Sequence, residues 1–343
     1  MRTAAEQQAT YRLRLRASVV SIVVGFLVCL LKFAGFLTTG SYAILSDALE
    51  SIINVAAASF AAYCIVQGAR KADFDHPYGR GRLEYFSASL EGALILLAGV
   101  IILNESIPKL FAGNVVGRMD LGLMFTGVGT VANGILAAFL IRSGKKHHSM
   151  ALEADGHHVW SDVVSSIGLF VGLVLVAISK LPWLDPLLAC IMALWILWSG
   201  FRILRQSFFQ LMDRASPDVV TKVTSAIAEL RKPEMIHPHR MRLRESGPYV
   251  LVDFHMIVPR FFTVRQLHDL EEHIHRNLES ILDRPVDLML HNDPCTSNNC
   301  GYCSMKNCRV RKKKQTSQLK LDPQHLLEDI SHPVKVRGTF SVG

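Results

Sequence analysis

The sequence predicts a membrane protein of two parts: six transmembrane helices and, after them, a small soluble α+β domain. Half of its 343 residues are hydrophobic. They are concentrated in the first two-thirds of the chain, where apolar runs reach the roughly 20 residues that a helix needs to cross a bilayer. The last third has the mixed patterns of ordinary soluble sequence, so a membrane domain followed by a soluble domain is expected.

Six apolar runs are long enough to be spans, and their number is even. We expect them at about 15–37, 41–67, 83–104, 120–142, 152–178 and 183–205. The segment before the first run is polar and basic. No cleavage site of the small-residue type follows that run closely, so no cleavable signal peptide is expected.

Basic residues are enriched in alternate loops. They gather before the first run, after the second and after the fourth, at Arg2, Arg12, Arg14, Arg16, Arg70, Lys71, Arg80, Arg82, Arg142, Lys145 and Lys146. Cytoplasmic loops carry such an excess, so both ends of the chain are predicted to lie in the cytoplasm. This membrane topology accounts for the net charge of +8 better than a nucleic-acid partner does.

The soluble part is predicted to begin near Asp213 and to follow the order αββαβ. "SPDVVTKVTSAIAELRK" has a Ser-Pro helix start, and "TVRQLHDLEEHIHRNLESIL" is a second amphipathic helix with Thr263 as its N-cap. "HRMRLRESGPYVLVDFHMIV" alternates around "ESGP" as a hairpin does, and "PVDLMLHND" is a third strand. We expect two helices packed on a three-stranded sheet. The predicted domains are therefore 1–212 (transmembrane), 213–294 (sheet domain) and 295–343 (a basic, cysteine-rich tail, expected to be partly disordered).

Two of the predicted spans contain pairs of polar residues four positions apart. Glu50 and Asn54 share one face of the second helix, and His158 and Asp162 share one face of the fifth. Ionisable groups at bilayer depth cost at least about 2.5 kcal/mol each, so they need a compensating partner. A single polar residue is commonly interhelical glue, whereas two equally spaced pairs favour one four-ligand metal site. Zn²⁺ fits these ligands best, although Fe²⁺, Co²⁺, Mn²⁺ and Cd²⁺ stay open.

Other polar residues near these spans are expected to have different roles. His157 points about 100° away from its neighbour around the helix, so it is not expected to be a primary ligand. Glu84 and Glu91 in the third span and Asn133 in the fourth are interpreted as packing or pathway residues.

Five stretches of this chain resemble the cation diffusion facilitator family, whose members exchange divalent metals for protons. They are "GSYAILSDALES", "ADFDHPYGRGRLEYF", "ADGHHVWSDVVSS", "LMDRASP" and "LHNDPC", and the resemblance covers about residues 12–294. It implies a transporter rather than an enzyme, in a bacterial inner (plasma) membrane. It also implies a homodimer whose cytoplasmic αββαβ domain has a metallochaperone-like fold.

The resemblance implies a transport site at Glu50, Asn54, His158 and Asp162. Bacterial members usually have two aspartates, or histidine and aspartate, in the second span, whereas this chain has glutamate and asparagine. An amide binds divalent metal more weakly than a carboxylate and cannot release a proton. Asp47, one turn earlier, is the residue that could substitute.

The resemblance also implies two further metal sites and one ion pair. The loop site corresponds to Asp73, His76 and Arg80; because arginine cannot bind a cation, this site is expected to be degenerate, with Asp75 as a possible replacement. The cytoplasmic site corresponds to His239, His255, His268, His291 and Asp293. His237, His273 and His275 are interpreted as solvated surface histidines. A charge interlock between the two domains corresponds to Arg82 and Asp213.

Four cysteines follow the last predicted strand with the spacing C-x4-C-x2-C-x4-C. Cytoplasmic thiols are reduced, so metal binding is favoured over disulfides for Cys295, Cys300, Cys303 and Cys308. A reactive or idle tail and an iron–sulfur cluster are the alternatives. Cys29, Cys64 and Cys190 lie in spans and are interpreted as core residues.

The function that these features favour is efflux of a divalent metal, Zn²⁺ above the others, in exchange for protons by alternating access. The alternatives are a membrane-anchored metal sensor, which would need no ligands within the membrane, and a cation channel, which would show no coupled proton flux. No nucleophile–base set indicates catalysis.

Overall fold

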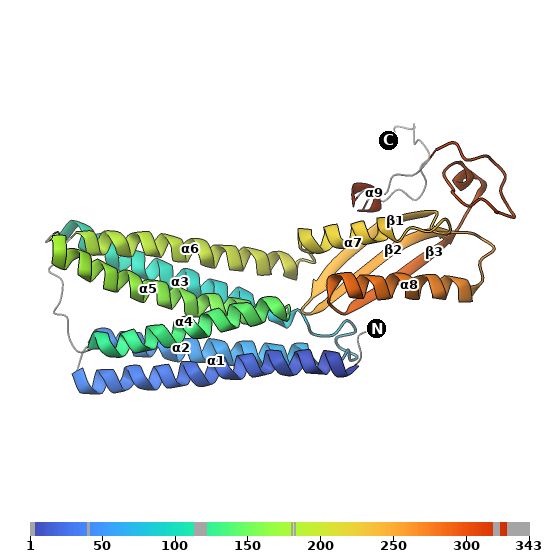
Figure 1. Ribbon diagram of the computed structural model, residues 1–343. Helices are drawn as coiled ribbons and strands as arrows, with labels where there is room; N and C mark the ends of the chain where they lie inside the picture. Colours follow the sequence, from blue (N-terminus) through green and yellow to red (C-terminus); the bar gives the residue numbers. More distant parts are fainter. Residues whose placement is uncertain are drawn as a thin grey trace, which may run out of the picture. The chain divides into compact units, whose positions relative to one another are not determined.

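The computed structural model describes residues 4–39, 42–112, 122–179, 181, 183–317 and 323–327. The described chain divides into two compact units, a helical unit, Ala4–Met212, and a C-terminal unit that begins at Asp213. Figure 1 shows both units, coloured along the sequence from blue at the N-terminus to red at the C-terminus. Each is described by itself below.

The helical unit contains six long helices. They are α1 (Ala4–Thr39), α2 (Tyr42–Gly68), α3 (Leu83–Ala112), α4 (Gly122–Lys146), α5 (Met150–Ser179) and α6 (Leu184–Leu211). Among the described residues, stretches long and apolar enough to cross a membrane are found in five of them, α1, α2, α3, α4 and α6. Helix α5 has 30 residues and carries the polar residues that the sequence placed in a span. The predicted class, a six-helix membrane domain before a small α+β domain, is confirmed.

Helix α5 is central in the helical unit, because it contacts each of the other five helices. Its polar residues therefore face protein rather than hydrocarbon, which is the arrangement that ionisable groups at bilayer depth require. Apolar side chains on the other helices point outward instead; Val131 and Ile135 of α4, for example, are 65% and 69% exposed. The bundle thus encloses buried polar residues such as Asp155 and His158 beside an apolar core, and its outer surface is largely apolar.

Small residues let neighbouring helices of the bundle approach closely. A Cβ on Gly92 of α3 would lie 2.8 Å from the backbone nitrogen of Leu204 in α6, and one on Gly200 would lie 3.0 Å from the Gly92 carbonyl oxygen. Between α4 and α5, a Cβ on Gly144 would lie 2.6 Å from the backbone nitrogen of Glu153. Such contacts favour association of helices in a membrane, where burial of apolar surface supplies little driving force.

The C-terminal unit contains a three-stranded sheet with the expected order αββαβ. Its elements are α7 (Pro217–Glu229), β1 (His237–Ser246), β2 (Tyr249–Val258), α8 (Val264–Leu282) and β3 (Val286–Pro294). Strand β2 is central, antiparallel to β1 and parallel to β3. The predicted hairpin turns at Gly247, whose φ of +58° favours glycine. The Thr263 hydroxyl accepts a hydrogen bond from the backbone N–H of Gln266, so this residue is the N-cap of α8, as predicted.

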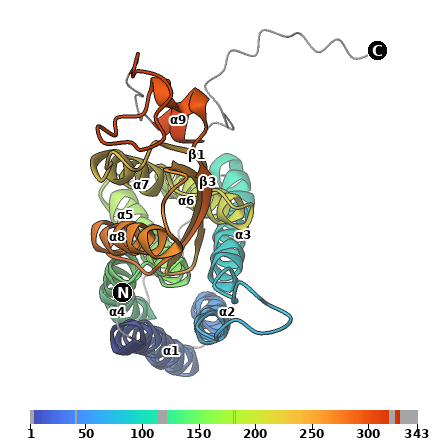
Figure 2. The same cartoon turned by 90° about the vertical axis from the view of Figure 1, so that its right-hand side faces the viewer.

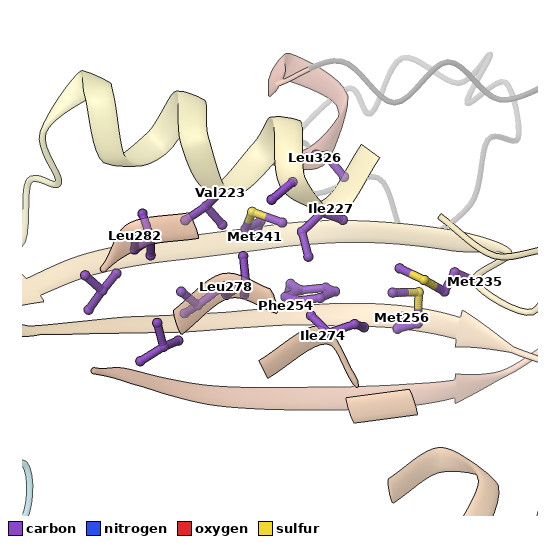
Figure 3. Close-up of a cluster of buried hydrophobic side chains, with 14 of the residues drawn as sticks. Val223, Ile227, Met235, Met241, Phe254, Met256, Ile274, Leu278, Leu282 and Leu326 are labelled. Atoms are coloured by element: carbon purple, nitrogen blue, oxygen red, sulfur yellow. The ribbon is translucent and has the colours of Figure 1, made fainter. Parts of the chain in front are cut away.

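Both helices cover the same face of the sheet, as Figure 2 shows. The core lies between them, and in Figure 3 Phe254 of β2 is surrounded by side chains such as Ile227 of α7 and Ile274 and Leu278 of α8. Each such side chain contributes about 1.5–3 kcal/mol when it is buried. Because side chains alternate along a strand, His255 lies on the opposite face of the sheet from Phe254.

The segment after β3 packs on the sheet domain. Tyr302 and Cys303 are buried against Ile236 and Ile257, next to a short 3-10 helix, η1 (Ser297–Gly301). A further short helix, α9 (Pro323–Leu327), adds Leu326 to the main core. Residues 318–322 and 328–343 of the predicted tail lie outside the described residues.

Candidate metal sites

Helices α2 and α5 bring three of the four predicted transport ligands together. The Nδ2 amide of Asn54 donates a hydrogen bond to Oδ2 of Asp162 over 2.5 Å. Its Oδ1 lies 2.8 Å from Nε2 of His158. His158 is buried, with 6% of its surface exposed, and Asn54 and Asp162 are half-buried. An imidazole, a carboxylate and an amide oxygen thus meet in the interior of the bundle.

The fourth predicted ligand is less enclosed. Glu50 lies one turn before Asn54 on α2, and its side chain is exposed. Asp47, the predicted substitute, lies in α2, but its side chain is outside the described part of the chain. Only the Asn54–His158–Asp162 part of this predicted site is therefore assembled by contacts that we can name.

Helix α3 supplies an acidic residue that the sequence analysis interpreted only as packing or pathway. Oε2 of Glu91 lies 3.5 Å from Nδ1 of His158, and Glu91 is 1% exposed. Histidine ligands in metal sites generally have such an acceptor on their second nitrogen. The seven-residue spacing of Glu84 and Glu91 puts both on one face of α3, which is the signal in the sequence that could have indicated an inward-facing acidic stripe.

A small polar cavity adjoins this cluster. It measures about 20 Å³, which is enough for a water molecule, and its lining includes Asn54, Asn133, Asp155 and Ser21. Ser21 of α1 donates a hydrogen bond to Asp155 over 2.7 Å. His157 lines a different cavity, of about 480 Å³, together with Trp195 and Arg202 of α6 and other residues of α4, α5 and α6. The exclusion of His157 from the primary ligands stays a prediction.

Glu84 belongs to a second buried polar cluster of the helical unit. It forms an ion pair with Arg14 of α1 and accepts a hydrogen bond over 2.6 Å from the hydroxyl of Ser149, which precedes α5. Arg14 and Glu84 are almost fully buried. Glu84 of α3 thus contacts both α1, through Arg14, and the residue before α5, through Ser149. These contacts agree with a packing role.

The sheet of the C-terminal unit aligns three of the predicted cytoplasmic ligands in one row. His239 of β1 is opposite His255 of β2, which is opposite His291 of β3. Residues that pair in this way share a face of the sheet. The ring centroids of His239 and His255 are 5.3 Å apart, and those of His255 and His291 are 4.5 Å apart.

Asp293 completes this cluster from the end of β3. Its carboxylate oxygens lie 3.1 Å from Nδ1 of His255 and 3.4 Å from Nε2 of His291. Ligand atoms of His239, His255 and Asp293 all lie within 4.8 Å of one another; no other group of three or more His, Cys, Asp or Glu residues in the described chain meets that limit. Two imidazoles and a carboxylate are a ligand set that Zn²⁺ accepts, with a fourth position left for another group.

His239 is held in a form suited to bind metal. Its Nδ1 lies 3.2 Å from the backbone oxygen of His237, and since a carbonyl can only accept, this nitrogen carries the hydrogen. Nε2 then has the lone pair, and it is buried without a hydrogen-bond partner in the described chain. Burial lowers the pKa of His239, which further favours the neutral ring.

Comparison with known proteins gives the family. The sequence profile described as the cation efflux transmembrane domain matches residues 18–212, and the one described as the cation efflux protein, cytoplasmic domain, matches residues 215–295. The chain is a member of the cation diffusion facilitator family. It is therefore a cation efflux transporter, as the resemblance in the sequence implied.

Three curated relatives illustrate the range of this family. The chain is 34% identical to an uncharacterized transporter of Synechocystis sp. over 77% of its own length and 86% of the relative. It is 26% identical to the manganese efflux system protein MneP of Bacillus subtilis, over 81% and 95%. It is 28% identical to the cation-efflux pump FieF of Citrobacter koseri, over 83% and 94%.

The loop site of this family member is occupied by an ion pair. Arg80 donates to Asp73 over 2.6 Å, and the backbone N–H and ring Nδ1 of His76 lie 2.9 Å and 3.2 Å from the other carboxylate oxygen. Desolvation raises the pKa of Asp73, but these hydrogen bonds and the charge of Arg80 outweigh it and lower the pKa overall. Both oxygens of Asp73 are engaged in these contacts, and the degeneracy of the site stays a prediction.

Two predictions, His268 as a ligand and the charge interlock, stay predictions. His268 is exposed on α8, which covers the face of the sheet opposite His255. The charge interlock would link Arg82 in the helical unit to Asp213 in the C-terminal unit, and it stays a prediction. Within its own unit, Arg82 donates to the Leu211 carbonyl over 3.5 Å, and Asp213 lies 3.6 Å from Arg244.

The interpretation of His237 as a surface residue is wrong. It is 4% exposed, and its ring stacks on His239 with centroids 5.0 Å apart. The ring of Tyr302, from the cysteine-rich segment, contacts its other side edge-on at 5.8 Å. The sequence contained no cue for this burial, because the residues that cover His237 come from beyond the last predicted strand.

Proposed function

We propose that this transporter exports a divalent metal, Zn²⁺ above the others, in exchange for protons. The observation that carries the proposal is the contact of Asn54, His158 and Asp162 inside the bundle. A sensor would need no such ligands within the membrane. Placing ionisable side chains at bilayer depth costs free energy, and a structural role does not require that cost. Glu50 is assigned as the fourth ligand, reached by a side-chain rotation on the same face of α2.

Proton exchange follows from the carboxylates of the site, because metal and protons compete for them, whereas His158 only moves its hydrogen from one ring nitrogen to the other. In the contact with Asn54 Oδ1, Nε2 of His158 donates, so its lone pair is not available. Metal binding needs that lone pair, and the hydrogen must then lie on Nδ1, 3.5 Å from Glu91. Glu91 is assigned as the acceptor that holds His158 in this tautomer. Carboxylates protonated on the outward-facing side would release the metal, so the site exchanges metal for protons as it alternates.

The cytoplasmic cluster of His239, His255, His291 and Asp293 is assigned a regulatory metal. We infer that the transporter acts as a homodimer and that His268, exposed on α8, joins this site only from a second copy. The membrane is assigned as the bacterial inner (plasma) membrane, with both termini in the cytoplasm. The basic residues in alternate loops support this orientation.

Metal uptake by purified protein in liposomes tests the proposal. Zn²⁺, Fe²⁺, Mn²⁺, Co²⁺ and Cd²⁺ are offered separately to wild-type protein, Asp162→Ala and Ser165→Ala. Ser165 is the matched control, because it lies on the same helix and its hydroxyl bonds to the backbone of that helix. We expect uptake with Zn²⁺ fastest, lost in Asp162→Ala and kept in Ser165→Ala. Metal binding without uptake in the wild type would favour a sensor instead, and faster Mn²⁺ uptake would overturn the metal assignment.

A further inference from the structure

The four cysteines of the C-terminal segment line one small cavity. Cys295 follows β3, Cys300 lies in η1, and Cys303 and Cys308 lie in the coil beyond it. The cavity measures about 10 Å³. Cys300 and Cys303 are 9% and 5% exposed, and the other two are half-buried. Residues separated by up to 13 positions thus present their thiols to a single space.

Side-chain hydrogen bonds fix the backbone around this cavity. Thr296 and Asn299 form a capping box at η1, and Asn299 also donates to the Tyr302 hydroxyl. Arg311 donates to the carbonyl oxygens of Cys300, Cys303 and Met305 over 3.3, 3.0 and 2.5 Å. The guanidinium of Arg311 therefore links three backbone carbonyls of the loop that lines the cavity. These hydrogen bonds hold a loop that has little regular secondary structure.

Basic residues surround the four thiols. Arg260, Arg311 and Lys312 line the same cavity. Four thiolates around a divalent ion leave a net charge of −2, which these basic residues offset.

We propose that Cys295, Cys300, Cys303 and Cys308 bind one Zn²⁺ ion per chain as a structural tetrathiolate site. Four cysteine ligands are typical of structural zinc, which binds them tetrahedrally. The cavity has room for a single ion rather than for an iron–sulfur cluster. No three of the four sulfurs lie within 4.8 Å of one another, so binding draws the thiols inward by side-chain rotation. The match to the family's cytoplasmic domain ends at residue 295, so three of the four ligands lie beyond it.

This ion has a defined structural consequence. Cys303 and the neighbouring Tyr302 are buried against Ile236 and Ile257, on the face of the sheet that carries the histidine row. Tyr302 contacts His237, which stacks on His239. The zinc ion therefore holds in place the segment that covers the buried end of the cytoplasmic histidine cluster, and it is distinct from that cluster.

Cobalt substitution in the full chain tests the proposal. The protein is purified in detergent with a phosphine reductant, stripped of metal and titrated with Co²⁺. Only thiolate ligands give sulfur-to-cobalt charge-transfer absorption, so the histidine cluster does not interfere. We expect a tetrathiolate spectrum that saturates at one Co²⁺ per chain and is displaced by Zn²⁺. Cys303→Ser abolishes it, whereas Cys190→Ser, which alters a cysteine of α6 outside the cavity, leaves it unchanged.

A second variant keeps the proposal falsifiable if Cys303→Ser does not fold. Cys308→His preserves four ligands, so we expect binding to remain at one equivalent with the spectrum shifted to three sulfurs and one nitrogen. A wild-type protein with four reactive thiols and no charge-transfer band would overturn the proposal. So would the visible absorption of an iron–sulfur cluster in the protein as purified.

Discussion

Asn54 of helix α2 donates a 2.5 Å hydrogen bond to Asp162 of helix α5, inside the helical unit. The contact joins the two helices whose polar pairs the sequence singled out. The resemblance to the family implies a carboxylate or an imidazole at this position, whereas this chain has an amide. The chemistry of the proposed transport site therefore depends on what this amide does.

Replacing the amide by a carboxylate is expected to strengthen metal binding. Asn54→Asp adds a negative charge beside His158 and Asp162, and we expect the affinity for Zn²⁺ to rise by about tenfold, or about 1.4 kcal/mol. The added carboxylate also contributes a proton that metal displaces. Calorimetry in two buffers of different ionisation enthalpy measures both quantities. Unchanged affinity and proton release would mean that residue 54 does not bind the ion.

Glu91 is predicted to position His158 without contacting the metal. Second-sphere partners of this kind typically contribute 10–100-fold to affinity or activity, so Glu91→Gln should reduce metal affinity by about that factor. Glu105→Gln is the matched control, because Glu105 lies on the same helix and is exposed. A structural role alone would lower stability and leave the affinity of the folded protein intact. Affinity and thermal melting are therefore measured on the same samples.

The cytoplasmic cluster should bind metal independently of the membrane site. His255→Ala removes the residue at the centre of the histidine row. We expect it to abolish one metal equivalent in the chain and the stabilisation which that metal gives to the cytoplasmic domain. His273→Ala, on helix α8 and outside the row, should retain both. Equal metal content in the wild type and in His255→Ala would contradict the assignment.

A buried ion pair makes the stability of the C-terminal unit depend on pH. Arg284 forms an ion pair with Glu245, and each is 6% exposed. Desolvation raises the pKa of Glu245, but the charge and hydrogen bonds of Arg284 outweigh it and hold the pKa below its usual value. The stabilisation is therefore complete above the unfolded-state pKa and is lost as pH falls through the lower folded-state pKa.

Substitution of Glu245 tests this acid dependence. Glu245→Gln leaves the arginine buried and uncompensated, so it should cost about 3–5 kcal/mol at pH 7 and flatten the acid limb of the unfolding curve. Glu272→Gln removes the partner of Arg276 in an exposed pair, which is expected to contribute about 0–1 kcal/mol. The free energy of unfolding of the wild type and of both variants is measured by denaturant unfolding at several pH values from 7 to 3. Parallel acid limbs for the wild type and Glu245→Gln would refute the linkage.

The sequence predicted features that depend on local pattern. Hydrophobic runs and helical spacing indicated the spans and the pairs Glu50–Asn54 and His158–Asp162, and alternation indicated the strands that align His255 and His291. Contacts between distant segments escaped it. Glu91 approaches His158 because α3 packs on α5, and His237 is buried because Tyr302 folds back over it. No local pattern reports which distant residue covers a side chain, so the sequence did not predict that the segment after β3 packs on the sheet domain.

Zinc flux under an imposed pH gradient tests the central claim most directly. Protein in liposomes that are more acidic inside than outside is given external Zn²⁺, while one dye reports internal zinc and another internal pH. Exchange predicts that the gradient accelerates zinc uptake, that the lumen becomes more alkaline as zinc enters, and that reversing the gradient suppresses uptake. Asp162→Ala should show neither flux. Zinc uptake that is indifferent to the gradient, with no accompanying proton movement, would contradict exchange and indicate a channel.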